Sequence, residues 1–361
     1  MKFYMPVRVY DEKECVRNHA EELASCGKKA LIVTGRRSAI SNGALSDVTD
    51  VLNDEGIEFR VYSEVEENPS TETIFNAVKM HVNKDVDFVI GIGGGSAMDA
   101  AKAIALVLKH PEADTSYLYD ISKPSDALPV ICIPTTCGTG SEVTGVSVLT
   151  RHDKRTKISM VHKVYPALAL VDGRYLKTAS HELIINSSVD ALSHLYESAL
   201  NSKADDYVRM TAMAGLKLWA RSRDILTGGR EASGEDYAML MRASTLAGMS
   251  IAMSGTSLPH ALSYMITYDL AMPHGKAVGY FLPGFLKAAP AAHRDKLLEL
   301  AGFNNTDELS GFILNVLGKP EIPDEVLART FDAVKSNSGK MTSACFSVDE
   351  DMLRDIVKEL M

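Results

Sequence analysis

The apolar residues of this chain change their spacing near residue 175. Before that point, short runs rich in β-branched residues alternate with stretches of helical periodicity. This alternation predicts parallel strands joined by right-handed helical crossovers in an open sheet. From about His181 onward, apolar residues recur at intervals of three and four, and strand-like runs become rare. We therefore expect an N-terminal α/β domain followed by a largely helical domain.

The predicted elements of the first half are four strands and three helices. The strands are expected at 30–34, 57–62, 88–90 and 129–133. The helices are expected at 11–26, 70–83 and 96–109. We expect the domain boundary between Asp172 and Ser180, which divides the chain into residues 1–177 and 178–361. Nucleotides bind at the carboxyl ends of the strands in such sheets.

Composition narrows the class of ligand. A chain of 361 residues is long enough for about two domains with separate cores. It has 38 Lys and Arg against 47 Asp and Glu, a net charge of -9. That sign disfavours binding to nucleic acid or to an anionic membrane surface, so we expect a small-molecule ligand.

The cysteines and the apolar segments bear on the cellular location. The five cysteines are scattered along the chain and form no CxxC pair: Cys15, Cys26, Cys132, Cys137 and Cys345. This pattern is typical of reduced thiols in a cytosolic protein. The first eight residues contain no apolar signal segment, and the sequence has no run of 18 apolar residues. We expect a soluble, cytoplasmic protein with no membrane partner.

A glycine-rich loop follows the strand predicted at 88–90. Gly93, Gly94 and Gly95 lead into a helix that begins near Ser96, and Asp99 lies three residues later. Glycines let a backbone approach a pyrophosphate closely, and the N-terminus of a helix favours an anion. The alternative is a tight strand-to-helix turn without a ligand, since Ser96 stands where a G-x-G-x-x-G motif would have its third glycine.

A second polar loop, residues 134–144, follows the strand predicted at 129–133. Its hydroxyl groups lie between glycines and belong to Thr135, Thr136, Thr139 and Ser141. Such a loop can wrap a polar cofactor, although a Gly/Thr surface loop without a ligand has the same composition. Two polar loops at the ends of parallel strands favour a nucleotide site.

Four residues of the second half form a candidate metal site. Asp190 and His194 are four residues apart, so on a helix they lie on one face and can bind one ion. His260 and His274 follow about seventy residues later. Imidazoles with one carboxylate suit iron, zinc or cobalt better than calcium. Any one of these histidines taken singly has an alternative role as a packed or surface residue.

These motifs together resemble the iron-containing (group III) alcohol dehydrogenases. The resemblance rests on the order and spacing of five motifs that span some 180 residues: Gly93–Ser96, Pro134–Glu142, Asp190 with His194, His260-Ala and His274-Gly275. It implies a Rossmann-like, parallel-sheet dinucleotide-binding domain, a helical metal-binding domain of the dehydroquinate synthase-like type, and a cleft between them. It also implies hydride transfer between nicotinamide C4 and a small alcohol or aldehyde.

The resemblance also implies roles for individual residues. The metal ligands would be Asp190, His194, His260 and His274, with iron(II) as the expected metal and zinc as the alternative. The cofactor would contact the glycine loop, the Thr/Gly loop, the loop after the strand at 57–62, and a lysine: Gly94, Gly95, Ser96, Asp99, Thr135, Thr136, Thr139, Ser141, Asn68 and Lys157.

Two positions depart from the pattern of many relatives. An Asp that usually follows the first strand and repels a 2'-phosphate is replaced here by Gly35, so we expect NADP(H) to be favoured over NAD(H). Arg36, Arg37 and Ser38 offer hydrogen-bond donors to that phosphate. The second departure is Tyr264, which stands where several relatives carry a His of the proton relay. The candidates for that role are Tyr264, a cofactor hydroxyl or water.

Other functions remain open at this stage. A glycerol dehydrogenase-like enzyme or a lyase of the dehydroquinate synthase type would share the fold, although the sequence shows no basic cluster near the ligands for a phosphorylated substrate. A non-catalytic nucleotide-binding protein would not need four metal ligands. By resemblance we expect a homodimer.

Overall fold

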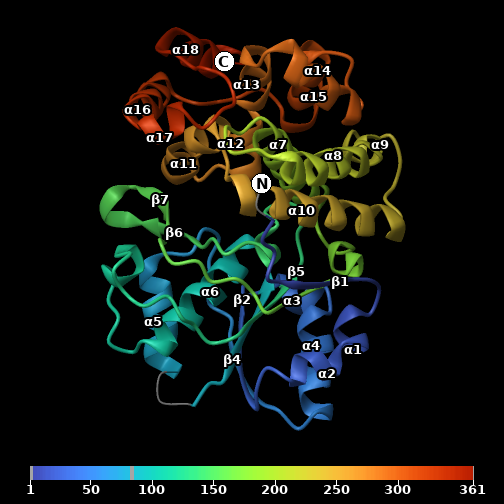
Figure 1. Ribbon diagram of the computed structural model, residues 1–361. Coiled ribbons are helices and arrows are strands. Elements are labelled where there is room, and N and C mark those ends of the chain that lie inside the picture. The colour runs from blue at the N-terminus through green and yellow to red at the C-terminus, as the bar shows by residue number, and fades with distance from the viewer. Residues whose placement is uncertain (1–2, 82–84, 361) are drawn as a thin grey trace. The chain divides into compact units, whose positions relative to one another are not determined.

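The computed structural model of the protein describes residues 3–81 and 85–360 (Figure 1). These residues form two compact units. One is Met5–Ala179, and the other runs from Ser180 onward and includes Phe3 and Tyr4. Residues 82 and 83, the end of the helix predicted at 70–83, lie outside the described residues.

The first unit contains a sheet of six parallel strands in the order β1-β8-β5-β4-β2-β3. Its strands are β1 (Arg8–Asp11), β2 (Lys29–Thr34), β3 (Glu58–Tyr62), β4 (Phe88–Gly93), β5 (Val130–Pro134) and β8 (Leu168–Val171). An antiparallel hairpin pairs β6 (Val148–Arg151) with β7 (Thr156–Ser159). Thr34 pairs with Ile92 and Gly93 with Pro134, so the carboxyl ends of β2, β4 and β5 lie at the same edge.

Helices cover both faces of this sheet (Figure 1). Alternate residues of β2 face opposite sides of the sheet. Leu31 and Val33 belong to one buried apolar cluster, and Ala30 and Ile32 belong to another. The first cluster includes α5 and α6, and the second includes α1, α2 and α4. The helices of this unit are α1 (Cys15–Asn18), α2 (Ala20–Ala24), α3 (Ser38–Ser41), α4 (Ala44–Asp54), α5 (Thr71–His81) and α6 (Gly95–Lys109). The strands therefore bury side chains on both faces, as in other doubly wound sheets.

Four short 3-10 helices complete the unit. They are η1 (Tyr117–Tyr119), η2 (Ser141–Val143), η3 (His152–Lys154) and η4 (Gly173–Leu176).

The predicted fold class is confirmed, and so are the four predicted strands, which correspond to β2, β3, β4 and β5. The helix predicted at 11–26 is wrong in its first turn. Asp11 ends β1, and Glu14 adopts the left-handed conformation with φ 61°, so the first helix begins only at Cys15. A second helix starts after His19.

The second unit is helical, as predicted, and the described residues from 180 onward contain no strand. Its helices are α7 (His181–Ala199), α8 (Asp206–Ala220), α9 (Arg223–Leu226), α10 (Gly234–Ser254), α11 (Leu258–Leu270), α12 (His274–Gly279), α13 (Leu282–Ala288), α14 (Ala291–Leu300), α15 (Thr306–Leu317), α16 (Asp324–Lys335), α17 (Ser338–Met341) and α18 (Glu350–Lys358). Among the helices that the structure describes, none combines the length and the hydropathy that crossing a bilayer requires.

The start of α10 is fixed by an ionic cap around the buried Asp236. The Ser233 hydroxyl accepts from the Asp236 backbone N–H at 3.3 Å, and the Asp236 carboxylate accepts from the Ser233 backbone N–H at 2.8 Å. Arg230 donates to both Asp236 oxygens at 2.7 Å. The Arg230 guanidinium lowers the pKa of Asp236 well below its usual range, and the two Ser233 donors add to this effect. These contacts satisfy N–H groups that the first turn of a helix leaves free.

We predict that Asp236→Asn lowers the free energy of unfolding by about 1–2 kcal/mol at pH 7, the usual effect of losing such a cap. The depressed pKa means that the carboxylate stabilises the fold above its unfolded pKa of about 3.9, and that this stability is lost as the pH falls through the folded pKa. The difference between wild type and variant in urea unfolding should therefore shrink below about pH 4.

Glu235→Gln is the matched control, because Glu235 is the exposed neighbour in the same helical turn. It should leave the urea midpoint nearly unchanged. A pH-independent difference between wild type and Asp236→Asn would contradict the assignment of this stability to the ionised carboxylate.

Candidate functional site

The two residues of the first metal half-site lie on α7. Ser180 caps this helix by accepting from the Leu183 backbone N–H at 3.2 Å. Asp190 and His194 are one turn apart on its buried face and are 3% and 5% exposed. Because i and i+4 positions share a face, the carboxylate and the imidazole project to the same side.

The second half-site lies at the N-terminal ends of two helices that pack near α7, namely α11 and α12. His260 lies in the first turn of α11, after Pro259, and His274 is the first residue of α12. Ligand atoms of Asp190, His260 and His274 all lie within 4.8 Å of one another. The His194 ring stacks on the His260 ring with centroids 4.2 Å apart. The structure thus brings all four predicted ligands together.

Gly275 makes this approach possible. A Cβ atom at Gly275 would overlap the carbonyl oxygen of Asn186, one turn before Asp190 on α7. It would also lie 3.1 Å from Cβ of Asp190. Only a residue without a side chain lets α12 come this close to α7, and that contact places His274 beside Asp190.

The polar atoms of this group fit a divalent metal. Oδ1 of Asp190 and Nε2 of His260 are buried and have no hydrogen-bond partner in the described part of the chain, although they lie 3.3 Å apart. Nε2 of His274 is 3.8 Å from the same carboxylate oxygen. Buried polar atoms rarely stay unsatisfied. One cation between these atoms would satisfy the orphaned pair, and a set of imidazoles with one carboxylate suits iron or zinc.

Charge interactions in the group favour a cation at its centre. Burial by itself would raise the pKa of Asp190, but His194, His260 and His274 lower it well below its usual range. Burial would lower the pKa of His260, but Glu197 and Asp190 on either side raise it, to about 9, so the two carboxylates favour a positive charge between them, which a proton on His260 or a metal ion beside it can supply. The carboxylate therefore stays ionised while buried, as a metal ligand must.

Tyr264, the candidate for the proton relay, lies next to the metal group. Its ring stacks on that of His274 with centroids 5.9 Å apart, and the residue is half-buried. It belongs to α11, one turn after His260.

In the α/β unit, the two predicted cofactor loops pack directly against each other. Gly94 is the N-cap of α6 and Gly95 its first residue. A Cβ atom at Gly94 would lie 3.1 Å from the Thr136 side chain, and one at Gly95 would lie 2.7 Å from Cγ2 of Thr139. The glycines thus let the Thr/Gly loop cover the start of α6, where free N–H groups form a ready anion site.

Asp99 and Ser141 join the same two loops through a lysine that the sequence analysis missed. Lys102 is fully buried, and its Nζ donates to Ser141 Oγ at 2.6 Å and to the Val146 carbonyl at 2.8 Å. Ser141 Oγ donates to Oδ1 of Asp99 at 2.5 Å, and Oδ2 of Asp99 accepts from the Val148 N–H at 2.9 Å. Asp99 and Ser141 therefore hold the loops together. The only signal in the sequence was a lysine three residues after Asp99 among apolar helix residues.

Asn68 and Lys157 complete the polar cluster beside the glycine loop. The Asn68 backbone N–H donates to Ser96 Oγ at 3.0 Å, and Lys157 Nζ donates to Asn68 Oδ1 at 2.9 Å. Thr150 of β6 also donates to the Asn68 carbonyl at 2.7 Å. The hairpin β6–β7 therefore places Lys157 beside Asn68, which in turn contacts Ser96 just after β4. Thr135 continues β5 directly, and its N–H donates to the Gly93 carbonyl at 2.9 Å.

Gly35, Arg36 and Ser38 lie after β2 at the same edge of the sheet. Arg36 and Ser38 are exposed. The Arg36 guanidinium donates through Nε and one Nη to Oε2 of Glu64, at 3.1 and 2.7 Å. One edge of the guanidinium is thus occupied by a carboxylate that follows β3, an interaction that the sequence analysis did not foresee.

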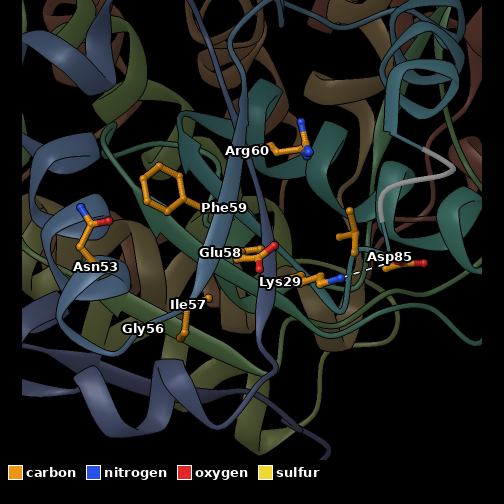
Figure 2. Close-up of a pocket in the computed structure, with 10 residues that line it drawn as sticks. Lys29, Asn53, Gly56, Ile57, Glu58, Phe59, Arg60 and Asp85 are labelled. Atoms are coloured by element: carbon orange, nitrogen blue, oxygen red, sulfur yellow. Dashed lines mark ion pairs between the residues drawn. The ribbon is translucent and has the colours of Figure 1, made fainter.

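A surface pocket of about 690 Å³ lies elsewhere in the α/β unit (Figure 2). Its lining includes Lys29, Glu58, Arg60 and Asp85, and the Lys29 amine pairs with the Asp85 carboxylate at 3.6 Å. Lys29 and Glu58 begin β2 and β3, so the pocket is at the amino ends of these strands, away from the loops described above.

Comparisons with known proteins agree on one family. Residues 6–173 match the family model described as iron-containing alcohol dehydrogenase. Residues 184–308 match the model of the C-terminal domain of the Fe-containing alcohol dehydrogenase family.

Individual relatives show the extent of this similarity. The chain is 29% identical to aldehyde-alcohol dehydrogenase 2 of Entamoeba histolytica over 79% of its own length and 34% of that protein, so it spans about a third of this relative. It is 28% identical to the NADPH-dependent butanol dehydrogenase of Clostridium saccharobutylicum, covering 88% of the chain and 82% of that protein. A solved iron-containing alcohol dehydrogenase of Thermotoga maritima is 34% identical, with a TM-score of 0.91 and 99% of each chain covered.

We predict that Gly95→Ala weakens dinucleotide binding, because its methyl group would press on Thr139 and push the Thr/Gly loop away from α6. Overpacking of this kind costs about 1–3 kcal/mol, which corresponds to roughly a 5- to 150-fold rise in Kd. Titration of nicotinamide fluorescence measures this Kd.

Two further variants test the cause. Gly95→Ala with Thr139→Ser removes the methyl carbon that is 2.7 Å away and should restore part of the affinity. Gly311→Ala is the control, since its Cβ would enter open space on α15. A double variant as weak as the single one would show that the Thr139 contact is not the cause.

Proposed function

The chain belongs to the iron-containing alcohol dehydrogenase family, and from this premise we propose that Asp190, His194, His260 and His274 hold a ferrous ion that serves an NADP(H)-preferring alcohol dehydrogenase. Its family makes the protein an iron-dependent oxidoreductase that uses NAD(P) and acts on alcohols and aldehydes. The orphaned pair formed by Asp190 Oδ1 and His260 Nε2 is the observation that carries the metal assignment.

The chemistry divides between the bound groups and the protein. A ferrous ion supplies Lewis acidity toward a carbonyl oxygen, and the nicotinamide supplies or accepts the hydride at C4. The residues of α7, α11 and α12 would bind and orient the metal ion. Asp190 contributes the negative charge, and its burial keeps water from competing for the carboxylate.

We infer that the loops of the α/β unit bind the dinucleotide. The N-terminus of α6 at Gly94, Gly95 and Ser96 holds the pyrophosphate through backbone N–H groups. Asn68 and Lys157 contact the adenosine side, while Thr135, Thr136 and Thr139 line the rest of the groove. Asp99, Ser141 and Lys102 hold these loops in register.

Tyr264 is the proposed proton donor to the developing alkoxide. Its position beside His274 supports this role. A phenol bears a proton at neutral pH, and hydride transfer to an aldehyde requires one proton for each alcohol formed. The substrate we propose is a short aldehyde or alcohol, in keeping with the butanol dehydrogenase among the relatives.

The preference for NADP(H) rests on Gly35 and Arg36. The absence of an acidic side chain directly after β2 removes a charge that would repel a 2'-phosphate. Arg36 is exposed, and its pair with Glu64 is exposed as well, so exchanging that carboxylate for a phosphate costs little. The related butanol dehydrogenase is named as NADPH-dependent. We further propose a cytoplasmic homodimer.

We predict that turnover depends on the metal. Protein loaded anaerobically with ferrous iron should oxidise NADPH in the presence of butanal, followed at 340 nm, and chelator-stripped protein should not. His274→Ala should lower metal affinity by more than roughly 100-fold, beyond what loss of an outer partner costs. Iron-independent turnover, or a His274→Ala variant that keeps its metal, would contradict the proposed site.

We also predict that loss of the Arg36 side chain affects one cofactor more than the other. Arg36→Ala should raise KM for NADPH by about 10-fold, the effect of losing one charged hydrogen bond of about 1.5 kcal/mol, and leave KM for NADH within about twofold. Arg60→Ala is the control, because this exposed arginine lines the pocket at the amino ends of the strands, and it should change neither value much. Equal effects on both cofactors would show that Arg36 does not contact the 2'-phosphate.

A further inference from the structure

Glu197 is a fully buried carboxylate on α7, one turn after His194. One oxygen, Oε1, lies 2.5 Å from Nδ1 of His260. The other, Oε2, accepts from the Ser257 backbone N–H at 2.5 Å, at the N-cap of α11. Burying a carboxylate is unfavourable unless strong partners compensate for the lost hydration, so these two short contacts account for its position.

The contact with Glu197 decides which nitrogen of His260 is available. An ionised carboxylate only accepts hydrogen bonds, so Nδ1 of His260 must carry a proton and donate. In the neutral ring the proton on Nδ1 leaves Nε2 with its lone pair free. That nitrogen is the one aimed at Asp190, 3.3 Å from Oδ1.

We propose that Glu197 is a positioning residue that fixes the tautomer and orientation of His260 and supplies a second negative charge to the metal group. This inference rests on the proposed function, because it assumes that His260 binds the metal. A divalent cation held by Asp190 and three neutral imidazoles would leave one positive charge uncompensated in the interior. Glu197 balances that charge without occupying a coordination position.

A second outer contact in the group is of a different kind. Nδ1 of His274 faces the hydroxyl of Ser263 at 3.5 Å, and a hydroxyl can either donate or accept. It therefore does not select one tautomer as a carboxylate does. The carboxylate contact of His260 therefore constrains the position of its proton more strongly than this hydroxyl contact constrains that of His274.

Glu197 is itself held from the C-terminal part of the chain. Ser257, its second partner, shares a hydrogen bond between hydroxyl groups with Ser343 at 2.8 Å. Ser343 also donates to the Lys340 carbonyl in α17 at 2.6 Å. These contacts connect the start of α11 to α17, so the carboxylate has little freedom to move away from His260.

Glu197→Gln separates this role from simple capping of α11. The amide oxygen of Gln could still accept from the Ser257 N–H, but its NH2 would then face Nδ1 of His260. His260 would have to accept at Nδ1 and carry its proton on Nε2, which blocks metal binding. If Gln instead turned its oxygen to His260, two N–H donors would face each other at Ser257. A residue that served only as a cap of α11 would tolerate the first arrangement.

The experiment measures metal affinity and coordination rather than turnover. For Glu197→Gln we expect the Kd for Co²⁺, measured by chelator competition, to rise by about 10- to 100-fold. The visible spectrum of the cobalt protein should also change, whereas the Kd for NADPH should stay within about twofold. A cobalt Kd and spectrum equal to those of wild type would overturn the proposal.

Two controls distinguish the possible outcomes. Glu182→Gln changes an exposed glutamate in the first turn of the same helix and should bind cobalt like wild type. If wild type itself bound no metal, the proposed function would fail, which is distinct from failure of this inference. In zinc-loaded wild type labelled with 15N-histidine, Nδ1 of His260 should carry a proton and Nε2 should not. A proton on Nε2 would refute the proposal even if the Gln variant did not fold.

Discussion

The close approach of α12 to α7 is the constraint on which the metal group depends. Without a side chain at Gly275, the start of α12 packs on the Asn186 carbonyl and brings His274 to Asp190. His260 reaches the same carboxylate from α11, beginning at a Pro-containing first turn. One missing methyl group therefore allows three helices to converge on a single buried oxygen, and interiors packed at crystal-like density leave no other way to make room.

Both halves of the protein place ionised groups in the interior, and in both the charges are paired. In the α/β unit the fully buried Lys102 lies among Asp99, Ser141 and the Val146 carbonyl. In the helical unit Asp190 and Glu197 flank His260. The two groups differ in whether a buried polar atom is left without a hydrogen-bond partner. The Lys102 network closes on itself and fixes two loops, whereas the group around His260 leaves Asp190 Oδ1 and His260 Nε2 without hydrogen-bond partners. An unsatisfied buried pair is the feature expected of a binding centre.

The sequence predicted four adjacent strands of the sheet, β5, β4, β2 and the edge strand β3, and missed the four shortest strands. The buried strands β2, β4 and β5 are continuous apolar runs, which is why periodicity found them. The missed strands β1, β6, β7 and β8 have four residues each, too few to establish a period. The hairpin matters for function, because it carries Lys157 to Asn68.

The sequence by itself determined the fold class, the two polar loops and the residue types of the metal group, because these depend on local periodicity, on glycines and on short spacings along one helix. Only the tertiary structure decided which side chains meet. Glu197 and His260 are 63 residues apart, Lys102 and Ser141 are 39 apart, and Arg36 and Glu64 are 28 apart. No local pattern encodes such pairs, since each forms only when helices and strands distant in sequence pack together, and the cost of burying a charge then determines which partner it must have.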